Sequence, residues 1–150
     1  MRTLKFINQQ LIKDTNMKHL YTSIYHNPGI SRAHLSKQTA LSKTTVSTLI
    51  DELIERNFIL DGGAGESGTT GRKPNQLYIR RNSHFIVVFN WYQNRIYTHL
   101  VDIAGTSVFQ EAYELKQGEA YVSASRNCFQ NSVLQHCAPD EILGICVVIA

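Results

Sequence analysis

Small hydroxyl side chains and one lysine gather between residues 42 and 48, directly after a predicted tight turn. Serine and threonine hydroxyls donate and accept hydrogen bonds, and a threonine methyl group can contact a thymine methyl group. Such side chains at the leading end of a helix are typical of a surface that reads base edges in the major groove of DNA. The candidate residues are Ser42, Lys43, Thr44, Thr45, Ser47 and Thr48.

Two short helices joined by a tight turn are predicted to position these residues. Ser31 is expected to cap a helix that runs to about Thr39, and Ser42 is expected to cap the next helix. Apolar residues in this next helix repeat at i, i+3, i+4, i+7 and i+8, which predicts a stripe that faces a core. They are Val46, Leu49, Ile50, Leu53 and Ile54. This is the layout of a helix-turn-helix, whose second helix enters the major groove.

The opposite face of the same helix carries two hydroxyl groups followed by two carboxylates. Because phosphates repel carboxylates, only the first two turns are expected to enter a groove. Ser31 and Arg32, at the start of the preceding helix, are expected to contact the phosphate backbone. An alternative is that these hydroxyl groups only cap helices and cover a solvated surface. In chain order, the opposite face holds Thr44, Thr48, Asp51 and Glu55.

Two helices are predicted before the helix-turn-helix. The first is a short amphipathic helix with apolar residues at Leu4, Ile7 and Leu11. A separate helix is expected to follow it and to end before the Pro28-Gly29 pair. Its apolar residues are Met17, Leu20, Tyr21 and Ile24, and its expected cap is Asp14, Thr15 or Asn16.

A glycine-rich loop between two short predicted strands follows the helices. The strands cover residues 58–60 and 76–79, and the loop runs from Gly62 to Pro74. Three helices followed by a hairpin form the winged variant of the helix-turn-helix. The loop ends in two cations that suit the narrow, electronegative minor groove of A·T-rich DNA, although a solvated basic loop is the alternative. These candidate residues are Gly71, Arg72, Lys73 and Pro74.

Residues 83–150 are predicted to form a second domain after a first domain of residues 1–82. Three strands at 84–90, 95–102 and 106–115 precede a helix at 119–136 and a buried apolar strand at 142–149. This order is a βββαβ unit, so the chain as a whole belongs to the α+β class. Apolar residues in rough helical register within the helix are Val122, Cys128, Phe129, Val133 and Leu134.

Charge separates the two predicted domains. Residues 1–82 hold twelve Lys and Arg against six Asp and Glu, whereas residues 83–150 hold three against six. A basic first half suggests that this half alone meets a polyanion. Three cysteines and six scattered histidines have no metal-ligand spacing, so neither a disulfide framework nor a metal site is expected. No segment predicts a signal peptide or a membrane span, so a cytoplasmic protein is expected.

The helix-turn-helix and the loop carry several motifs in a fixed order. They are Asn16, Ile30-Ser31-Arg32-Ala33-x-Leu35, Leu41-Ser42-Lys43-x-Thr45-Val46-Ser47, Asp51-Glu52-Leu53 and Gly71-Arg72-Lys73-Pro74. Together they resemble the ROK family of bacterial sugar-responsive repressors and sugar kinases, and the xylose-repressor branch in particular. The resemblance covers about the first 80 residues. It implies a winged helix-turn-helix followed by a partial actin-like (ribonuclease H-like) domain.

The resemblance also has departures. Ala40 stands at the turn where the family usually has glycine, and Asn90-Trp91-Tyr92 stands where its kinases carry an Asp-x-Gly phosphate motif. The family's sugar, zinc and catalytic residues would lie beyond residue 150, so a truncated effector domain is expected and the sugar effector stays open. An unfinished domain of this kind is expected to dimerise, to associate with another chain or to be only marginally stable.

These observations predict a DNA-binding transcription regulator, a repressor of sugar-utilisation genes, with double-stranded DNA as its partner. We expect a homodimer, no cofactor and no catalytic activity. Two alternatives stay open, namely a non-functional or dominant fragment of such a regulator and the remnant of a sugar kinase.

Overall fold

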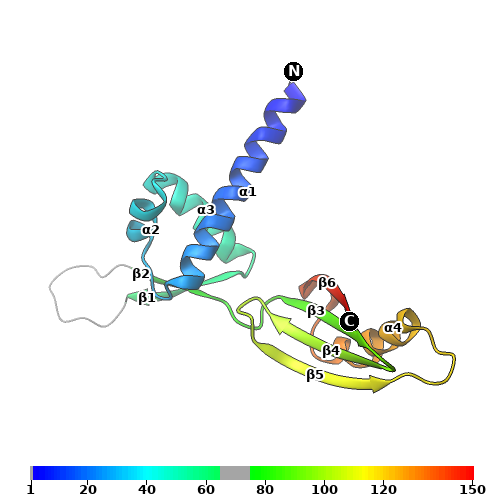
Figure 1. Ribbon diagram of the computed structural model, residues 1–150. Coiled ribbons are helices and arrows are strands. Elements are labelled where there is room, and N and C mark those ends of the chain that lie inside the picture. Colours follow the sequence, from blue (N-terminus) through cyan, green and yellow to red (C-terminus); the bar gives the residue numbers. More distant parts are fainter. Residues whose placement is uncertain (1, 65–74) are drawn as a thin grey trace. The chain divides into compact units, whose positions relative to one another are not determined.

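The computed structural model describes residues 2–64 and 75–150 (Figure 1). The chain divides into two compact units, Met1–Arg80 and Arg81–Ala150, and each has its own hydrophobic core. Within the described residues, no helix is both long and apolar enough to cross a membrane.

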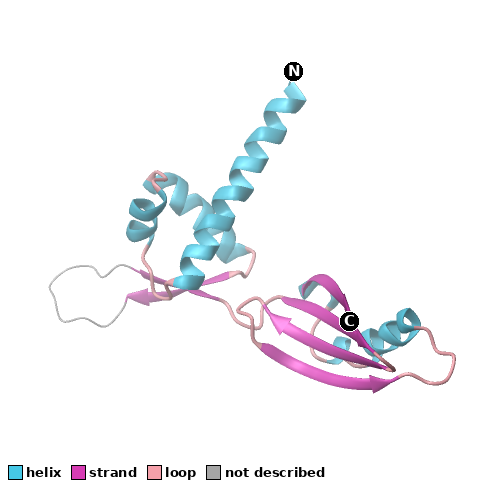
Figure 2. Cartoon of the chain, viewed as in Figure 1, coloured by secondary structure: helices cyan, strands magenta, loops and turns pink. Residues whose placement is uncertain are grey.

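The first unit is a three-helix bundle with a two-stranded hairpin (Figure 2). Its elements are α1 (Arg2–His26), α2 (Arg32–Thr39), α3 (Lys43–Glu55), β1 (Ile59–Ala64) and β2 (Asn75–Ile79). β1 and β2 pair in antiparallel fashion, and Ile30 adds an isolated bridge to Leu77. This order confirms the predicted winged helix-turn-helix.

Helix α1 corrects the prediction of two separate helices before the turn. It runs without interruption from Arg2 to His26, because no proline or glycine breaks the backbone ladder there. The expected caps have other roles. The Thr15 hydroxyl donates to the carbonyl of Leu11 at 2.8 Å, and the Asp14 carboxylate accepts from the Gln10 amide at 2.8 Å. Both contacts span one helical turn and are made within the helix.

The core of the first unit is made by one face of each helix and by the hairpin. Four of the five residues in the predicted α3 stripe are buried, and Ile54 is half-buried. Burial of each such side chain contributes about 1.5–3 kcal/mol before the entropy cost. The fully buried side chains of this core are Leu20, Ile24, Leu35, Val46, Ile50, Ile59 and Leu77.

Two serine caps set where α2 and α3 begin, and one left-handed residue lies in the turn between them. The Ser31 hydroxyl accepts from the backbone N–H of His34, and the Ser42 hydroxyl accepts from that of Thr45, which confirms both caps. Ala40 has φ 57° and ψ 13°, a left-handed conformation that is unfavourable for a residue with a Cβ atom. Ala40 therefore carries backbone strain where a glycine would carry none.

The hairpin is longer than predicted. Strand β1 extends through Gly62, Gly63 and Ala64, which the sequence had assigned to the loop. The pairing register shifts between Asp61 and Ala64, and Gly63 has φ 73°, so the two glycines support a bulge and do not end the strand. A Cβ atom on Gly62 would lie 2.8 Å from the Tyr78 ring, so this position has no room for a side chain.

The second unit is a four-stranded mixed sheet with one covering helix. Its strands lie in the order β5-β4-β3-β6, with β6 parallel to β3, which confirms the predicted βββαβ order. The elements are β3 (Phe85–Tyr92), β4 (Arg95–Asp102), β5 (Ser107–Glu114), α4 (Tyr121–Asn131) and β6 (Ile142–Ile149). Two 3-10 turns, Val133–Gln135 and Pro139–Glu141, connect α4 to β6.

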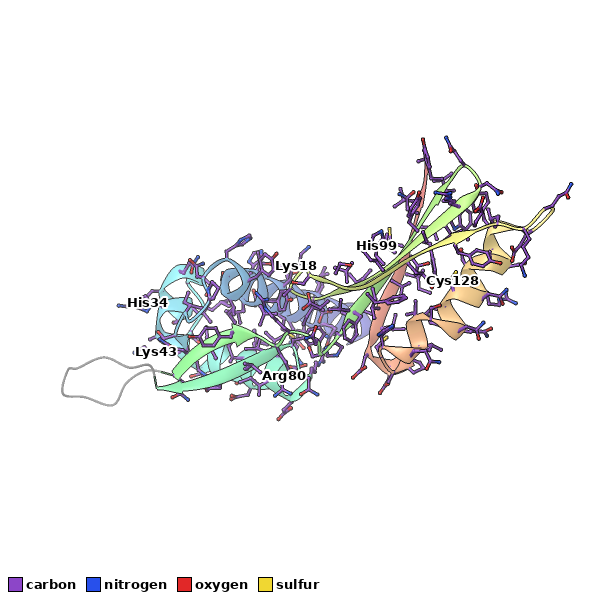
Figure 3. The ribbon with its side chains drawn as sticks, turned by 90° about the horizontal axis from the view of Figure 1, so that it is seen from below. Lys18, His34, Lys43, Arg80, His99 and Cys128 are labelled. Carbon is purple, nitrogen blue, oxygen red and sulfur yellow. The ribbon has the colours of Figure 1, made fainter. Side chains whose placement is uncertain are left out.

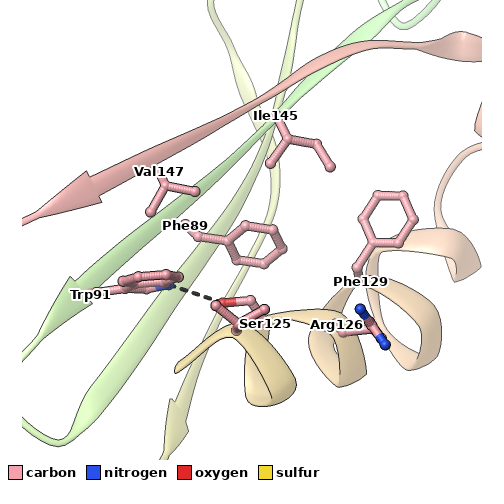
Figure 4. Close-up of a pocket in the computed structure, with 8 residues that line it drawn as sticks. Phe89, Trp91, Ser125, Arg126, Phe129, Ile145 and Val147 are labelled. Carbon is pink, nitrogen blue, oxygen red and sulfur yellow. Dashed lines mark hydrogen bonds between the residues drawn. The ribbon is translucent and has the colours of Figure 1, made fainter. Parts of the chain in front are cut away.

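Three predictions for this unit are wrong. The helix expected to reach His136 ends at Asn131, and Val122, expected in its apolar register, is 61% exposed. Strand β6 is not buried, because it is the edge strand of the sheet and α4 packs mainly over β3 and β4. Leu143 is 51% exposed and Ile149 75%. An apolar groove remains between α4 and β6, where the Trp91 indole donates to the Ser125 hydroxyl at 2.9 Å (Figure 4).

Replacement of Ala40 by glycine tests the strain at the turn. Glycine lacks the Cβ atom that makes the left-handed conformation unfavourable, but it loses more backbone entropy than alanine on folding. The strain that is relieved is the larger of the two free energies, so Ala40→Gly should stabilise the first unit by about 0.5–1 kcal/mol. Urea unfolding followed by far-ultraviolet circular dichroism measures this change. The same substitution at the exposed, helical Ala33 should destabilise by about 1 kcal/mol. If both variants were destabilised, the strain at Ala40 would be refuted.

Candidate nucleic-acid interface

The exposed face of α3 presents the hydroxyl groups that the sequence singled out. Thr44 and Thr48 are exposed, whereas Val46, Leu49 and Ile50 on the other side are buried. The Thr48 hydroxyl donates to the carbonyl of Thr44 at 3.1 Å, so its lone pairs can still accept from a ligand. The leading end of α3 is thus a solvent-facing row of small polar groups.

The start of α3 adds a cation and oriented backbone groups. Lys43 is exposed at this end of α3 (Figure 3). Ser42 is also exposed, and Thr45 is half-buried with its hydroxyl 2.8 Å from that of Ser42. The first backbone N–H groups of a helix point away from it and favour an anion, and Lys43 adds a full positive charge there. This end of α3 could therefore bind a phosphate.

Ser31 and Arg32 lie in a different environment from the α3 residues. Ser31 is only 6% exposed, and its hydroxyl caps α2. Nη1 of Arg32 donates to the Ser47 hydroxyl at 3.0 Å and to the Asp51 carboxylate at 2.7 Å. The structure brings Arg32 together with Ser47, but it places both the Ser31 hydroxyl and the Arg32 guanidinium in contacts within the protein.

A cluster of charges that the sequence analysis missed ties α1 to α3. Nζ of Lys13 lies 2.7 Å from Oε2 of Glu52, and Nη2 of Arg56 lies 2.5 Å from Oε1 of the same carboxylate. The hydrogen bond from Lys13 is the main cause of a lowered pKa of Glu52. Only the Glu52–Arg56 pair has a signal in the sequence, namely its spacing of four residues on one helix.

The predicted wing residues Gly71, Arg72, Lys73 and Pro74 lie outside the described residues. The strands that lead to them are described as far as Ala64 and from Asn75 onward. Asn75 donates from its side-chain amide to the Asp61 carboxylate at 2.8 Å, which joins the two strands at the base of the wing.

The second unit offers a hydrophobic site and no cluster of reactive groups. No group of three or more His, Cys, Asp or Glu residues suited to a metal ion occurs among residues 2–64 and 75–150. All three cysteines are free thiols, and burial raises the pKa of Cys128 and of Cys137. The residues that line the groove between α4 and β6 are Phe89, Trp91, Val122, Ser125, Arg126, Phe129, Ile145 and Val147.

Comparison with known proteins agrees with this geometry. A family of winged helix-turn-helix DNA-binding domains matches residues 13–59. A putative xylose repressor of Caldicellulosiruptor sp. (strain Rt8B.4) is 35% identical over 112 residues, which are 75% of this chain and 28% of that protein. The xylose repressor of Bacillus spizizenii is 29% identical over 116 residues, or 77% of this chain and 30% of the relative.

A solved structure extends the similarity to both units. The crystal structure of a ROK family transcriptional regulator, a homologue of the E. coli MLC protein, matches with a TM-score of 0.72 and 18% sequence identity. The match covers 92% of this chain and 36% of that one. The chain is similar in sequence to xylose repressors, and its fold matches that of part of a ROK regulator. It spans about a third of the length of the ROK regulator and of the xylose repressors that it matches.

The link between α1 and α3 gives a prediction for acid pH. Because the pKa of Glu52 is lowered in the folded state, its contribution to the stability of this ROK-like unit is complete at neutral pH and is lost as the pH falls through that lowered pKa. Lys13→Ala should raise the pKa of Glu52 towards its ordinary value and weaken this acid dependence. Side-chain carboxyl titration by NMR measures the pKa, and urea unfolding at several pH values measures the acid dependence of stability. The exposed Lys18 on the same helix is the matched control, since Lys18→Ala should leave the Glu52 titration unchanged.

Proposed function

We propose that the chain is a sequence-specific DNA-binding regulator that acts as a repressor of sugar-utilisation genes. The observation that carries the proposal is the two-sided helix α3, whose buried stripe fixes it to the core while Thr44 and Thr48 face solvent. The match to winged helix-turn-helix DNA-binding domains supports the nucleic-acid ligand, and the xylose repressors among the relatives support the repressor role.

In this proposal the first two turns of α3 enter the major groove. Thr44 and Thr48 contact base edges, since hydroxyl groups pair with donors or acceptors and their methyl groups contact thymine. Lys43 and the N-terminus of α3 contact a phosphate and fix the position of the helix along the groove. Ser42, Thr45 and Ser47 lie beside these contacts.

The wing would bind the adjacent minor groove. Arg72 and Lys73 carry its charge, and Gly71 and Pro74 flank them in the sequence. A narrow minor groove concentrates negative potential, so an inserted arginine gains more there than on an open surface. We further propose that two copies of the chain bind as a dimer, because helix-turn-helix proteins commonly read two half-sites related by two-fold symmetry.

Selection of bound sites from random duplex DNA tests the proposal. We expect a defined motif with an A·T-rich segment at the position of the wing, and two inverted half-sites if the chain binds as a dimer. Recovery of unselected sequences with no enriched motif would refute sequence-specific binding.

Thr44→Ala tests direct base contact by α3. The variant should alter the selected motif at one position and lose about 1 kcal/mol of discrimination there, while its affinity for random DNA should stay nearly unchanged. Thr22→Ala on α1 removes an equally exposed hydroxyl from a surface without a proposed base contact and serves as the control. The same motif from Thr44→Ala and from the wild type would remove Thr44 from the interface.

Arg72→Ala tests the wing. Loss of one phosphate-neutralising cation should weaken binding to all sequences and lower the slope of log affinity against log salt by about 1. Arg95→Ala removes an exposed arginine from the second unit and controls for the change in net charge. An unchanged salt slope for Arg72→Ala would contradict its contact with the DNA backbone.

A further inference from the structure

We propose that Arg32 is a positioning residue, which orients the recognition surface of α3 and the base of the wing and does not bind a DNA phosphate. This inference rests on the proposed DNA-binding function and assigns a role within it. It differs from the phosphate-contacting role that the sequence predicts for Arg32, because the structure supplies intramolecular partners for the guanidinium.

The first part of the argument is the link between α2 and α3. Nη1 of Arg32 donates to the Asp51 carboxylate at 2.7 Å, to the Ser47 hydroxyl at 3.0 Å and to the Ser47 carbonyl at 3.3 Å. The bond to Asp51 is charge-assisted and belongs to the stronger class of hydrogen bonds. The Arg32 side chain is only 29% exposed. These contacts fix one helix of the helix-turn-helix against the other at Ser47 and Asp51, which lie one helical turn apart on α3.

The second part is the orientation of the Ser47 hydroxyl. A serine oxygen that accepts from a guanidinium keeps its own proton for another partner. Ser47 is half-buried beside the exposed Thr44 and Thr48. Arg32 therefore favours Ser47 as a hydrogen-bond donor towards the groove, where it would pair with a base acceptor such as N7 or O6 of guanine or O4 of thymine.

The third part is the connection to the wing. Nη2 of Arg32 lies 3.9 Å from Oδ2 of Asp61 on β1. The same Asp61 carboxylate accepts from the Asn75 amide on β2 at 2.8 Å and from the backbone N–H of Gly63 at 3.1 Å. One guanidinium thus contacts α3 directly and also faces the carboxylate that joins the two strands of the wing.

Charge balance also favours the positioning role. Asp51 and Asp61 together supply two negative charges around the one positive charge of Arg32. A guanidinium in this setting adds little net attraction for a phosphate, and its release would leave two carboxylates without their cation. By contrast, Lys43 is exposed at the start of α3, with no acidic residue in the first turn of that helix.

The test compares the salt dependence and the specificity of Arg32→Ala with those of the wild type. Affinities are measured for the selected site and for random DNA over a series of salt concentrations. If Arg32 positions the surface, the salt slope should stay unchanged, while the ratio of specific to random affinity should fall by about tenfold. If Arg32 binds a phosphate, the slope should fall by about 1 and both affinities should decrease together, which would overturn the inference.

Asp51→Asn is the second variant, because its side chain is 57% exposed and its replacement preserves shape. It should lower the specificity ratio in the same direction as Arg32→Ala, and the double variant should lower it no further than the stronger single variant. If Arg32 were a phosphate ligand restrained by Asp51, Asp51→Asn would free it and strengthen binding to random DNA. Additive effects of the two variants on the ratio would also contradict the inference.

The design separates this inference from the proposed function. Lys116→Ala in the second unit removes one exposed cation. It should change neither the salt slope nor the ratio of specific to random affinity. A wild-type chain that selects no DNA motif would refute the proposed function and the inference together. A wild-type chain that selects a motif, combined with an unaltered specificity ratio in Arg32→Ala, would refute only the positioning role.

Discussion

The one-sided burial of α3 is the constraint on which the rest of the first unit depends. A helix of 3.6 residues per turn that buries Val46, Leu49, Ile50 and Leu53 must turn Thr44 and Thr48 outward. The same hydrophobic contacts that stabilise the bundle therefore define which side chains meet a ligand. Leu20 and Ile24 of α1 and Leu35 of α2 complete the surface against which α3 packs. Stability and recognition in this unit therefore depend on opposite faces of the same helix.

Burial alone fixes which face of α3 is hidden, but polar contacts fix its direction. The left-handed Ala40 turns the chain between α2 and α3, and the Ser42 cap sets where α3 begins. In its trailing half, α3 is held from two sides, by Lys13 of α1 through Glu52 and by Arg32 of α2 through Asp51. The two carboxylates of these ion pairs belong to consecutive residues of α3. The ion pairs add to the resistance that the buried stripe offers against rotation of α3 about its own axis.

The sequence predicted the elements that have strong local signals. Serine caps, a five-residue apolar stripe and short apolar segments were sufficient for α2, α3, β4 and β6 and for the order of both units. The sequence did not predict contacts between distant residues. Arg32 and Asp51 are nineteen positions apart, and no local pattern marks them as partners. The continuous α1 was missed because Asp14, Thr15 and Asn16 have cap chemistry that the helix does not use. The burial of β6 was misjudged because an apolar sequence does not show how far a single helix can cover a four-stranded sheet.

The charges along α3 point to the end of the helix that would meet DNA. At its trailing half, Asp51 and Glu52 are each paired with a cation from within the first unit. At its leading end, Lys43 and the positive end of the helix dipole face solvent with no acidic residue in the first turn. The electrostatic potential along α3 is therefore positive at the first turn and decreases towards the last turns. There the carboxylates of Asp51 and Glu52 are neutralised by their cations, and the exposed Glu55 ends the helix. A polyanion would be attracted to the start of α3 and would gain nothing at its end, so the charges favour the same orientation as the row of hydroxyl groups.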